Sequence, residues 1–453
     1  MMQQATFERK IALRSPVILF ACALLFKLAL DFSFNKFLVG AGYAYRFSFH
    51  FDPLRYALGL GWCTVLFWSI DHSAKKPSTF LLAMLYLLEI IPITTIYSLE
   101  GGSHIYYHSV CIAFFLCEMM VRSSPATIRF RRNRIFSGIM VSCFAAAVVL
   151  LLLILIRENG LPSLTALNIY KVYEMRASGA FHLSKYANYL LTWATNVFLP
   201  ILITLALLKN RWFSALLMCG VLLLIYLYTG QKTFLFVIPL LIVFVPWSKR
   251  ENFYCEFFAC FCIGFSMLIL LRWISPVLQS ALSAAYDLLC RRSMLLPAQN
   301  KFVYYDYFST RPKLGLYGAF PQWLVSIPDP LQGVDYGYDI SAIYYNRPNM
   351  NSNTGFLAEG YMRFGYIGIF LLLQLLAVLL RMVDGFRLRA GYAMTVGVFL
   401  YPIFVLADGH LFDSLILGPW MILVIFMLFY QGAIKRKEYI LETCLLYTSP
   451  SPR

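Results

Sequence analysis

Charged residues are scarce in this sequence. Of its 453 residues, 13% are Asp, Glu, Lys or Arg, whereas 60% are hydrophobic. A soluble domain of ordinary composition carries about 25% charged residues, because its surface has to be solvated. The shortage of charge therefore excludes an ordinary soluble protein and indicates that most of the chain lies in the hydrophobic interior of a membrane.

Several motifs are also missing. The sequence has no Walker A loop and no G-x-G-x-x-G, so a nucleotide-powered machine is not indicated. None of the 11 cysteines forms a C-x-x-C pair, and no D-x-D or H-E-x-x-H occurs in the long segments described below. We therefore predict no zinc site, no disulfide framework, no catalytic metal and no cofactor.

The sequence does contain a series of apolar runs close to the length of about 20 residues that crosses a membrane. Every backbone N–H and C=O inside lipid has to be paired within the protein, so runs of this length are expected to be helices. We predict an all-α, polytopic integral membrane protein with about 12 transmembrane helices, forming one membrane domain over residues 1–443. The runs cover residues 15–33, 54–70, 78–98, 105–121, 135–156, 188–208, 212–229, 233–247, 253–271, 365–380, 391–407 and 414–430.

The formal net charge of +16 comes largely from Lys and Arg in the connections between these runs. Basic residues gather in alternate connections, for example at 129–134, 209–211 and 249–250, whereas the turns near 99–104 and 408–413 have none. Cytoplasmic connections carry the excess of Lys and Arg in membrane proteins. We therefore expect both termini in the cytoplasm, a lipid bilayer as the partner of the basic residues, and no nucleic-acid partner.

Two long segments interrupt the series, at residues 157–187 and 272–364, and both fall on the predicted outer side. Long loops escape the charge rule, so their basic residues do not contradict this topology. The second segment is too aromatic for disorder, and we expect it to fold against the membrane surface with short helices, such as one over 274–290. Residues 444–453 resemble translated sequencing-adapter sequence, and we assign this non-native tail no function.

The outer side also gathers cations. Charge at a membrane interface is costly, so such a group indicates an anionic ligand, and the planar guanidinium of Arg can bond two phosphate oxygens at once. The alternative is that these side chains extend to lipid headgroups or pair with nearby acids. The candidates are Arg176, Lys232, Arg292, Arg311 and Arg347.

Candidate proton acceptors lie on the same side. They are Glu359, His410 and Asp306, and any of them within hydrogen-bond reach would assist attack by a hydroxyl group. Glu359 stands four residues before Arg363, so an i,i+4 ion pair is the structural alternative. Glu89, like Glu118, falls within an apolar run, a position that a proton-coupled carrier would require.

Four stretches resemble motifs of the bacterial oligosaccharide repeat-unit polymerases, the O-antigen polymerase (Wzy) family. They are "NIYKVYEMR", "YLYTGQKTFLFVIPLL", "RRSMLLPAQNKFVYYDYFSTRP" and "NSNTGFLAEGYMRFGYIGIF". The family pattern falls on Arg176 in the first, and on Lys232 in the second, where the family usually has Arg. In the third it falls on Arg292 and a Tyr-Tyr-x-x-Phe element, and in the fourth on residues 353–356. The resemblance covers residues 165–380 best.

The resemblance implies a metal-independent glycosyltransferase of the membrane-embedded GT-C class in the bacterial inner membrane, with a large periplasmic loop. Such an enzyme works on glycans linked to undecaprenyl diphosphate. The growing chain leaves its lipid diphosphate and passes en bloc to a sugar hydroxyl of the next lipid-linked unit, which builds O-antigen or another surface polysaccharide. A chain-length regulator protein is a candidate partner.

The resemblance also implies roles for the residues named above. The five cations would bind the diphosphate, with Arg176, Lys232 and Arg292 as its main ligands, and Glu359, His410 or Asp306 would be the base. Two other functions share this layout. One is an O-antigen ligase, which transfers the glycan to a different acceptor, and the other is a non-enzymatic flippase or transporter of the lipid-linked glycan.

Overall fold

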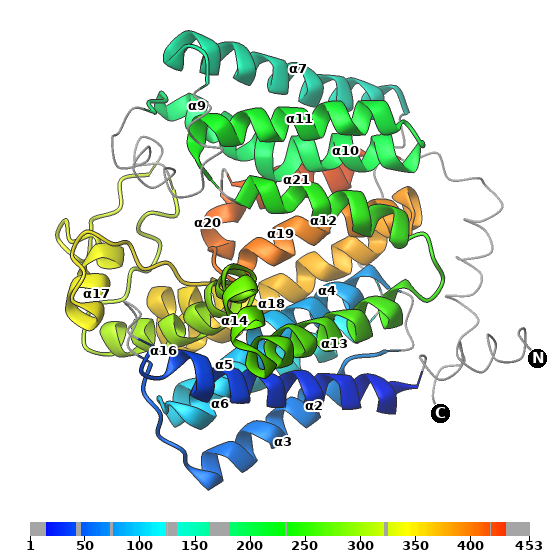
Figure 1. Cartoon of the computed structure of the whole chain (residues 1–453). Helices are drawn as coiled ribbons and strands as arrows, with labels where there is room; N and C mark the ends of the chain where they lie inside the picture. The colour runs from blue at the N-terminus through cyan, green and yellow to red at the C-terminus, as the bar shows by residue number, and fades with distance from the viewer. Residues whose placement is uncertain are drawn as a thin grey trace, which may run out of the picture. The chain divides into compact units, whose positions relative to one another are not determined.

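A computed structural model describes residues 15–41, 47–72, 76–123, 125, 134–162, 181–231, 233–320, 325–416 and 418–431. These residues form helices and connecting turns, with no β-strand among them, which confirms the predicted all-α class. Figure 1 shows and labels these helices. The chain divides into two compact units, each made of separate stretches of sequence.

Eight helices within the described ranges are long and apolar enough to cross a membrane. They cover Pro16–Leu38, Pro77–Leu99, His104–Arg122, Ile135–Asn159, Lys185–Leu208, Trp212–Thr229, Phe253–Ile274 and Phe356–Ala390. Three shorter apolar helices, Thr233–Trp247, Tyr392–Leu406 and Pro419–Phe429, coincide with further predicted runs, and the remaining run forms the 17-residue helix α3, Pro53–Ser69. The chain is therefore a helical protein with the features of a polytopic membrane protein.

Unit 1 comprises Met1–Ser124, Asn252–Leu380 and Ile403–Asp413. Its centre is the continuous helix made of α4 (Pro77–Leu85), the π-helical turn η2 (Tyr86–Ile90) and α5 (Ile91–Leu99). The most apolar part of this helix is wholly buried, as expected for a helix that is apolar on every side. Pro92 follows the widened turn because it has no backbone N–H to donate to the preceding turn. Glu89 lies within η2, a type of irregularity that is frequent at functional sites.

Other helices of unit 1 surround this central helix. α2 (Pro16–Ser33) packs against α13 (Phe253–Ile274), and both α2 and α3 also contact α5. α6 (His104–Arg122) packs on α3, and Tyr107 of α6 stacks on Tyr97 of α5 with ring centroids 3.9 Å apart. The helices therefore pack along their lengths, and the turns that connect them lie at the ends of the unit.

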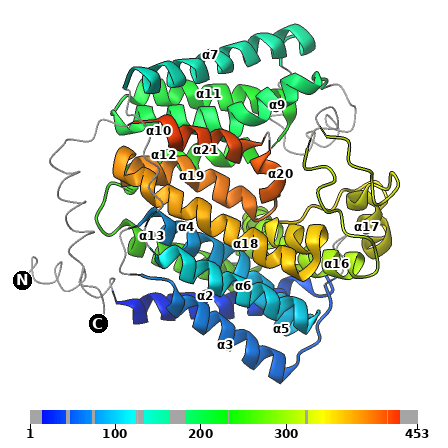
Figure 2. The ribbon, with the colours of Figure 1, turned by 180° about the vertical axis from the view of Figure 1, so that it is seen from behind.

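The long segment after α13 folds at one end of unit 1. It contains the short helices α14 (Pro276–Ala281) and α15 (Ser283–Tyr286), the π-helix η5 (Asp287–Leu295), and α16 (Leu296–Ser309) and α17 (Tyr336–Tyr345). The expectation of short helices over 274–290 is confirmed. Figures 1 and 2, seen from opposite sides, both place α16 and α17 at the same end of the unit.

Contacts bring the other predicted outer turns to this same end. Gln299 of α16 donates from Nε2 to Glu100 Oε1 at 2.8 Å, in the turn between α5 and α6. Lys301 Nζ lies 3.5 Å from the carbonyl oxygen of Ala407, in the turn before α20 (Leu411–Leu415). At the opposite end, His72 Nδ1 lies 2.5 Å from the hydroxyl of Tyr254, at the start of α13. The three segments predicted to share the outer side are therefore neighbours.

α18 (Phe356–Ala390) contains a sharp break at Phe364 and Gly365. The φ of Gly365 is +66°, a conformation that glycine adopts without steric cost. The break separates a short first part of α18 from its apolar part. The apolar part therefore begins at residue 365, which is the predicted start of the run 365–380. A Cβ on Gly360 would lie 2.9 Å from the carbonyl oxygen of Gly368, and this close packing requires glycine.

Unit 2 comprises Pro125–Glu251, Arg381–Pro402 and Ser414–Arg453. α10 (Leu199–Leu208) packs against both α11 (Trp212–Thr229) and α12 (Thr233–Trp247). α7 (Arg134–Asn159) lies against the π-helical turn η4 (Ala194–Phe198), which follows α9 (Lys185–Trp193), where Phe144 stacks on Phe198 with centroids 4.4 Å apart. α19 (Tyr392–Leu406) begins in this unit, and α21 (Pro419–Phe429) belongs to it.

Candidate functional site

Glu359 lies in the first turn of α18 and is completely buried. Its carboxylate accepts hydrogen bonds from the backbone N–H groups of Leu411 at 2.7 Å, Phe412 at 3.1 Å and Asp413 at 3.4 Å. These are the first N–H groups of α20, which have no partners within their own helix. Glu359 therefore fixes the turn that follows α19 onto the start of α18.

Arg363 completes this arrangement. Its Nε donates to Glu359 Oε1 at 3.2 Å, its Nη1 donates to the carbonyl oxygens of Gly315 and Tyr317 at 3.0 Å each, and its Nη2 donates to Asp413. The i,i+4 pair of Glu359 and Arg363 predicted as the structural alternative is confirmed. Because the guanidinium donates to two carboxylates and two carbonyls, it joins three separate stretches of unit 1 at one point.

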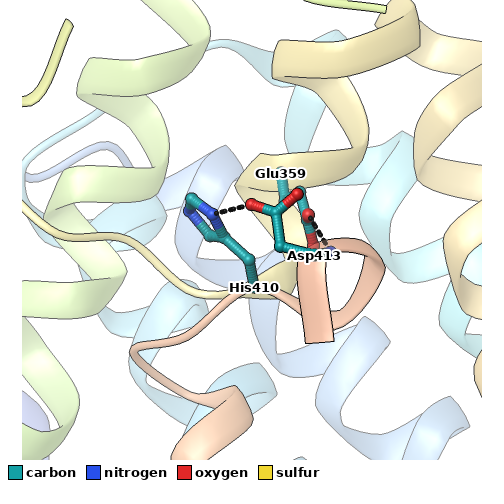
Figure 3. A group of neighbouring side chains, drawn as sticks. All are labelled: Glu359, His410 and Asp413. Carbon is teal, nitrogen blue, oxygen red and sulfur yellow. Dashed lines mark hydrogen bonds and ion pairs between the residues drawn. The ribbon is translucent and has the colours of Figure 1, made fainter. Parts of the chain in front are cut away.

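His410 lies beside Glu359 and Asp413, as Figure 3 shows. Its Nδ1 lies 3.0 Å from Asp413 Oδ2, and both side chains are partly exposed. Burial alone would lower the pKa of His410, but the hydrogen bond to Asp413 and the negative charges of Glu359 and Asp413 outweigh it and raise this pKa above its ordinary value. A carboxylate that accepts from Nδ1 also orients the imidazole and makes Nε2 the proton acceptor of the neutral ring.

Glu359, His410 and Asp413 each place one potential ligand atom within 4.8 Å of the others. A divalent cation would, however, compete with a cation that is already present. The guanidinium of Arg363 contacts both carboxylates and is itself buried. Arg363 thus already neutralises one of the two negative charges, and the chemistry of this group fits a hydrogen-bonded proton acceptor better than a metal centre.

A second charged group lies deeper in unit 1. Lys301 of α16 is buried, and its Nζ lies 2.9 Å from Glu89 Oε2 of the central helix. The same Nζ contacts the carbonyl oxygens of Pro297 and Ala407 at 3.3 and 3.5 Å. The pair ties α16 to a charge inside an apolar helix.

Asp408 follows Ala407 in the same turn. Its side chain reaches solvent, but the protein packed around it excludes much of the water that would stabilise the carboxylate. This desolvation raises the pKa of Asp408 to about 6, although the positive charges of Lys301 and His410 act to lower it. A carboxylate with this pKa can accept a proton near neutral pH. His410 in "ADGHLFD" was predicted from the sequence as a proton acceptor, whereas Asp408 was not. Its acidic type and its place in a short turn were visible, but the positive charge of Lys301 beside it was not.

The predicted cations have different environments. Arg292 is about half exposed, with Nε 3.8 Å from Asp287 Oδ2. Arg311 lies with its guanidinium 3.8 Å from the centroid of the Tyr307 ring and 3.7 Å from Asp339. Arg347 is exposed after α17. Arg176 and Lys232 lie outside the described residues, so the meeting of these five cations at one ligand stays a prediction.

The three predicted proton acceptors do not all lie together. Glu359 and His410 meet around Asp413, whereas Asp306 is exposed on α16 and accepts a hydrogen bond from the hydroxyl of Tyr344 at 2.6 Å. The carboxylate of Glu359 already accepts from Arg363 and three backbone groups. Of the three, His410 is the one whose position and pKa suit proton transfer best.

Two of the four motif stretches pack on one another in unit 1. Asn300 donates from Nδ2 to the carbonyl oxygen of Asn353 at 2.6 Å, and Tyr305 and Tyr366 join their hydroxyls at 2.8 Å. A Cβ on Gly355 would overlap the carbonyl of Ala407, so this glycine allows the start of α18 to approach the turn that carries His410. The fourth stretch thus contributes Glu359 to the candidate site, and the third stretch packs on the fourth.

Comparison with known proteins gives no relative from which to transfer a function. No family model matches the chain, and neither the curated proteins nor the solved structures match it. Functional assignment therefore depends on the residues and contacts described above.

Proposed function

We propose that this protein is a membrane-embedded glycosyltransferase that polymerises undecaprenyl-diphosphate-linked oligosaccharide units into a surface polysaccharide. The proposal is supported by the order of the four motif stretches and by the packing of two of them on one another, with the fourth stretch bonded to the turn that carries a histidine–carboxylate pair. The observation on which it chiefly depends is the pair of His410 and Asp413, with Asp413 bonded in turn to Arg363. A base oriented by a carboxylate is the arrangement that activates a hydroxyl nucleophile.

The proposed reaction uses His410 as the base. The acceptor sugar hydroxyl gives its proton to Nε2 of His410, and its oxygen bonds to the anomeric carbon of the growing chain. The bond between that carbon and the diphosphate oxygen breaks, and the electron pair leaves with undecaprenyl diphosphate. Asp413 stabilises the imidazolium that forms, as expected for a carboxylate that accepts from Nδ1. Asp408, which solvent reaches, is a candidate to receive the proton afterwards.

Negative charge develops on the leaving diphosphate, and fixed cations stabilise such charge. We propose Arg292, Arg311 and Arg347 for this role, together with Arg176 and Lys232. Loss of one donor of this kind typically lowers the rate by about 10²–10³. Tyr338, which is 44% exposed in the same segment, would offer a flat face to a sugar ring.

The proposal includes a topology. All twelve predicted runs would span the bacterial inner membrane in a GT-C-like arrangement, with both termini in the cytoplasm and the segment 272–364 on the periplasmic side. The shorter helices would then cross the membrane where the bilayer is locally thinner. The protein would require no metal or cofactor, and a chain-length regulator protein would be its partner.

One observation favours a transport function instead. Ionisable residues inside apolar helices often mark ion or substrate paths, and Glu89 pairs with Lys301 in the buried part of unit 1. We rank this second because Lys301 also contacts two backbone carbonyls, which is the behaviour expected of a structural ion pair. A ligase would share the reaction of the polymerase and differ only in its acceptor.

A deletion strain tests the proposal. Loss of a polymerase leaves surface glycan that ends after a single repeat unit, whereas loss of a ligase or flippase leaves the surface without the glycan. Complementation with His410→Gln is expected to give the same single-unit glycan although the protein still inserts. His50→Gln, which changes an exposed histidine at the same end of unit 1, serves as the matched control and is expected to restore full polymer. Full-length polymer with His410→Gln would refute the role of this base.

A further inference from the structure

Arg272 is a buried cation whose donors are incompletely paired. It lies in the last turn of α13, is 8% exposed, and has no carboxylate partner within the described part of the chain. Its guanidinium carbon lies 4.5 Å from the ring centroid of Phe37 and 4.1 Å from that of Tyr286. Its Nε and Nη1 atoms find no hydrogen-bond acceptor among the described residues. The two rings stabilise the charge but leave both donors unused.

Two further arginines lie close to Arg272 in the fold. Arg291 and Arg292 belong to η5, where the carboxylate of Asp287 accepts from Arg291 Nη2 at 2.9 Å and lies 3.8 Å from Arg292 Nε. The positive charge of Arg272 acts on the thiol of Cys290 and opposes the effect of burial on its pKa, which places the guanidinium beside η5. Arg272 thus lies beside a helical turn that carries two further arginines, and such a positive setting attracts an anion.

The residues that follow Arg272 along the chain expose apolar side chains. Trp273 is 54% exposed, Ile274 is 67% exposed and Val277 is 76% exposed. α13 is one of the helices able to cross a membrane, and tryptophan is enriched where such helices meet the headgroups. An arginine at this depth ordinarily extends to the interface, whereas Arg272 lies between two rings. A ligand that joins an anionic headgroup to a hydrocarbon chain would match both features.

We propose that Arg272 binds the phosphate of a membrane lipid at the end of α13. Its planar guanidinium can donate from Nε and one Nη atom to two phosphate oxygens at once. Because Nε and Nη1 are hidden from solvent, the side chain turns out from between Phe37 and Tyr286 to make these bonds. The lipid is either a polyprenyl diphosphate or a glycerophospholipid, since both carry a phosphate next to a hydrocarbon chain. The inference does not depend on glycosyl transfer.

The experiment measures lipid binding to the purified full-length protein in detergent by native mass spectrometry. Undecaprenyl diphosphate and phosphatidylglycerol are titrated separately. Arg272→Gln is expected to weaken binding of at least one of them by about tenfold or more, because a hydrogen bond from a charged group contributes roughly one to two powers of ten in affinity. Lys36→Gln removes an exposed charge next to Phe37 and is expected to leave both affinities within about twofold of the wild type.

The outcomes separate the sources of the phosphate. Weaker binding of undecaprenyl diphosphate alone supports a site for the lipid-linked diphosphate, and equally weaker binding of both lipids supports a phospholipid headgroup site. The proposal is overturned if Arg272→Gln, with wild-type elution and unfolding temperature, binds both lipids normally. An equal loss with Lys36→Gln also overturns it, because general surface charge would then explain the binding.

Two further measurements cover the case in which Arg272→Gln does not fold. Arg272→Lys keeps the buried charge and removes the two-oxygen geometry, so it is expected to fold and to bind the preferred lipid several-fold more weakly. Cryo-electron microscopy of the wild-type protein with that lipid needs no substitution. Phosphate density within about 4 Å of Nε or an Nη atom supports the proposal. Density for the phosphate at a different place, with Arg272 still between its rings, overturns it.

Discussion

The substitution Glu359→Gln tests the hydrogen-bonded group that joins α18 to the turn before α20. Gln keeps the volume of Glu and one acceptor oxygen, but it removes the charge and places an amide N–H₂ near Arg363 Nε. Breaking a buried ion pair costs about 3–5 kcal/mol when the remaining charge loses its compensation. Arg363 retains Asp413 and the carbonyl oxygens of Gly315 and Tyr317, so we expect the lower end, about 3 kcal/mol.

The free energy of unfolding can be measured by titrating the full-length protein in mixed micelles with sodium dodecyl sulfate and following its circular dichroism. Asp306→Asn is the matched control, because it makes the same carboxylate-to-amide change at an exposed residue with one hydrogen bond, from Tyr344. We expect this control to lose less than about 1 kcal/mol. If Glu359→Gln lost no more than the control, the carboxylate of Glu359 would not be the anchor of the turn, and the reasoning would be refuted.

Three further predictions concern the neighbouring charges. Asp413→Asn removes the negative charge that helps to raise the pKa of His410 and leaves only a weaker, neutral acceptor for Nδ1. The titration of this histidine, followed by NMR with labelled histidine, should therefore move to lower pH. Lys301→Met should lower the free energy of unfolding by about 3–5 kcal/mol, and adding Glu89→Gln should recover part of the loss, because it removes the charge left unpaired. Asp408 has a pKa raised from 3.8 to about 6, so the folded state binds its proton more tightly than the unfolded chain does. The stability of the wild type should therefore fall as the pH rises through this window, and Asp408→Asn should remove that part of the pH dependence, as unfolding titrations at several pH values would show.

The helices were predictable because lipid imposes a length and forbids unpaired backbone groups. The run at 105–121, for instance, became α6 at His104–Arg122. The end of the long segment at Phe364 was also predictable, since Gly365 follows it and breaks α18 there. The number of spans was harder to predict, because helices such as Thr233–Trp247 are close to the lower limit of a membrane-crossing length.

The candidate site was predictable only where its partners are close in sequence. The spacing of Glu359 and Arg363 on one helix face indicated their ion pair. Nothing local could indicate that Lys301 would reach Glu89, or that the second carboxylate bound by Arg363 would be Asp413, fifty residues further along. These contacts arise from the packing of separate helices, which single-sequence patterns do not encode.

The discontinuous construction of unit 1 has a consequence for synthesis in the cell. The central helix that carries Glu89 leaves the ribosome long before Lys301 exists, since 301 − 89 = 212 residues separate them. At about 5–20 residues per second this delay is roughly 10–40 s. During that time the carboxylate has to be neutralised by a proton or covered by another helix. We therefore expect the N-terminal helices to reach their final packing only after α16 is complete, and a chain truncated before Lys301 to be degraded by membrane proteases.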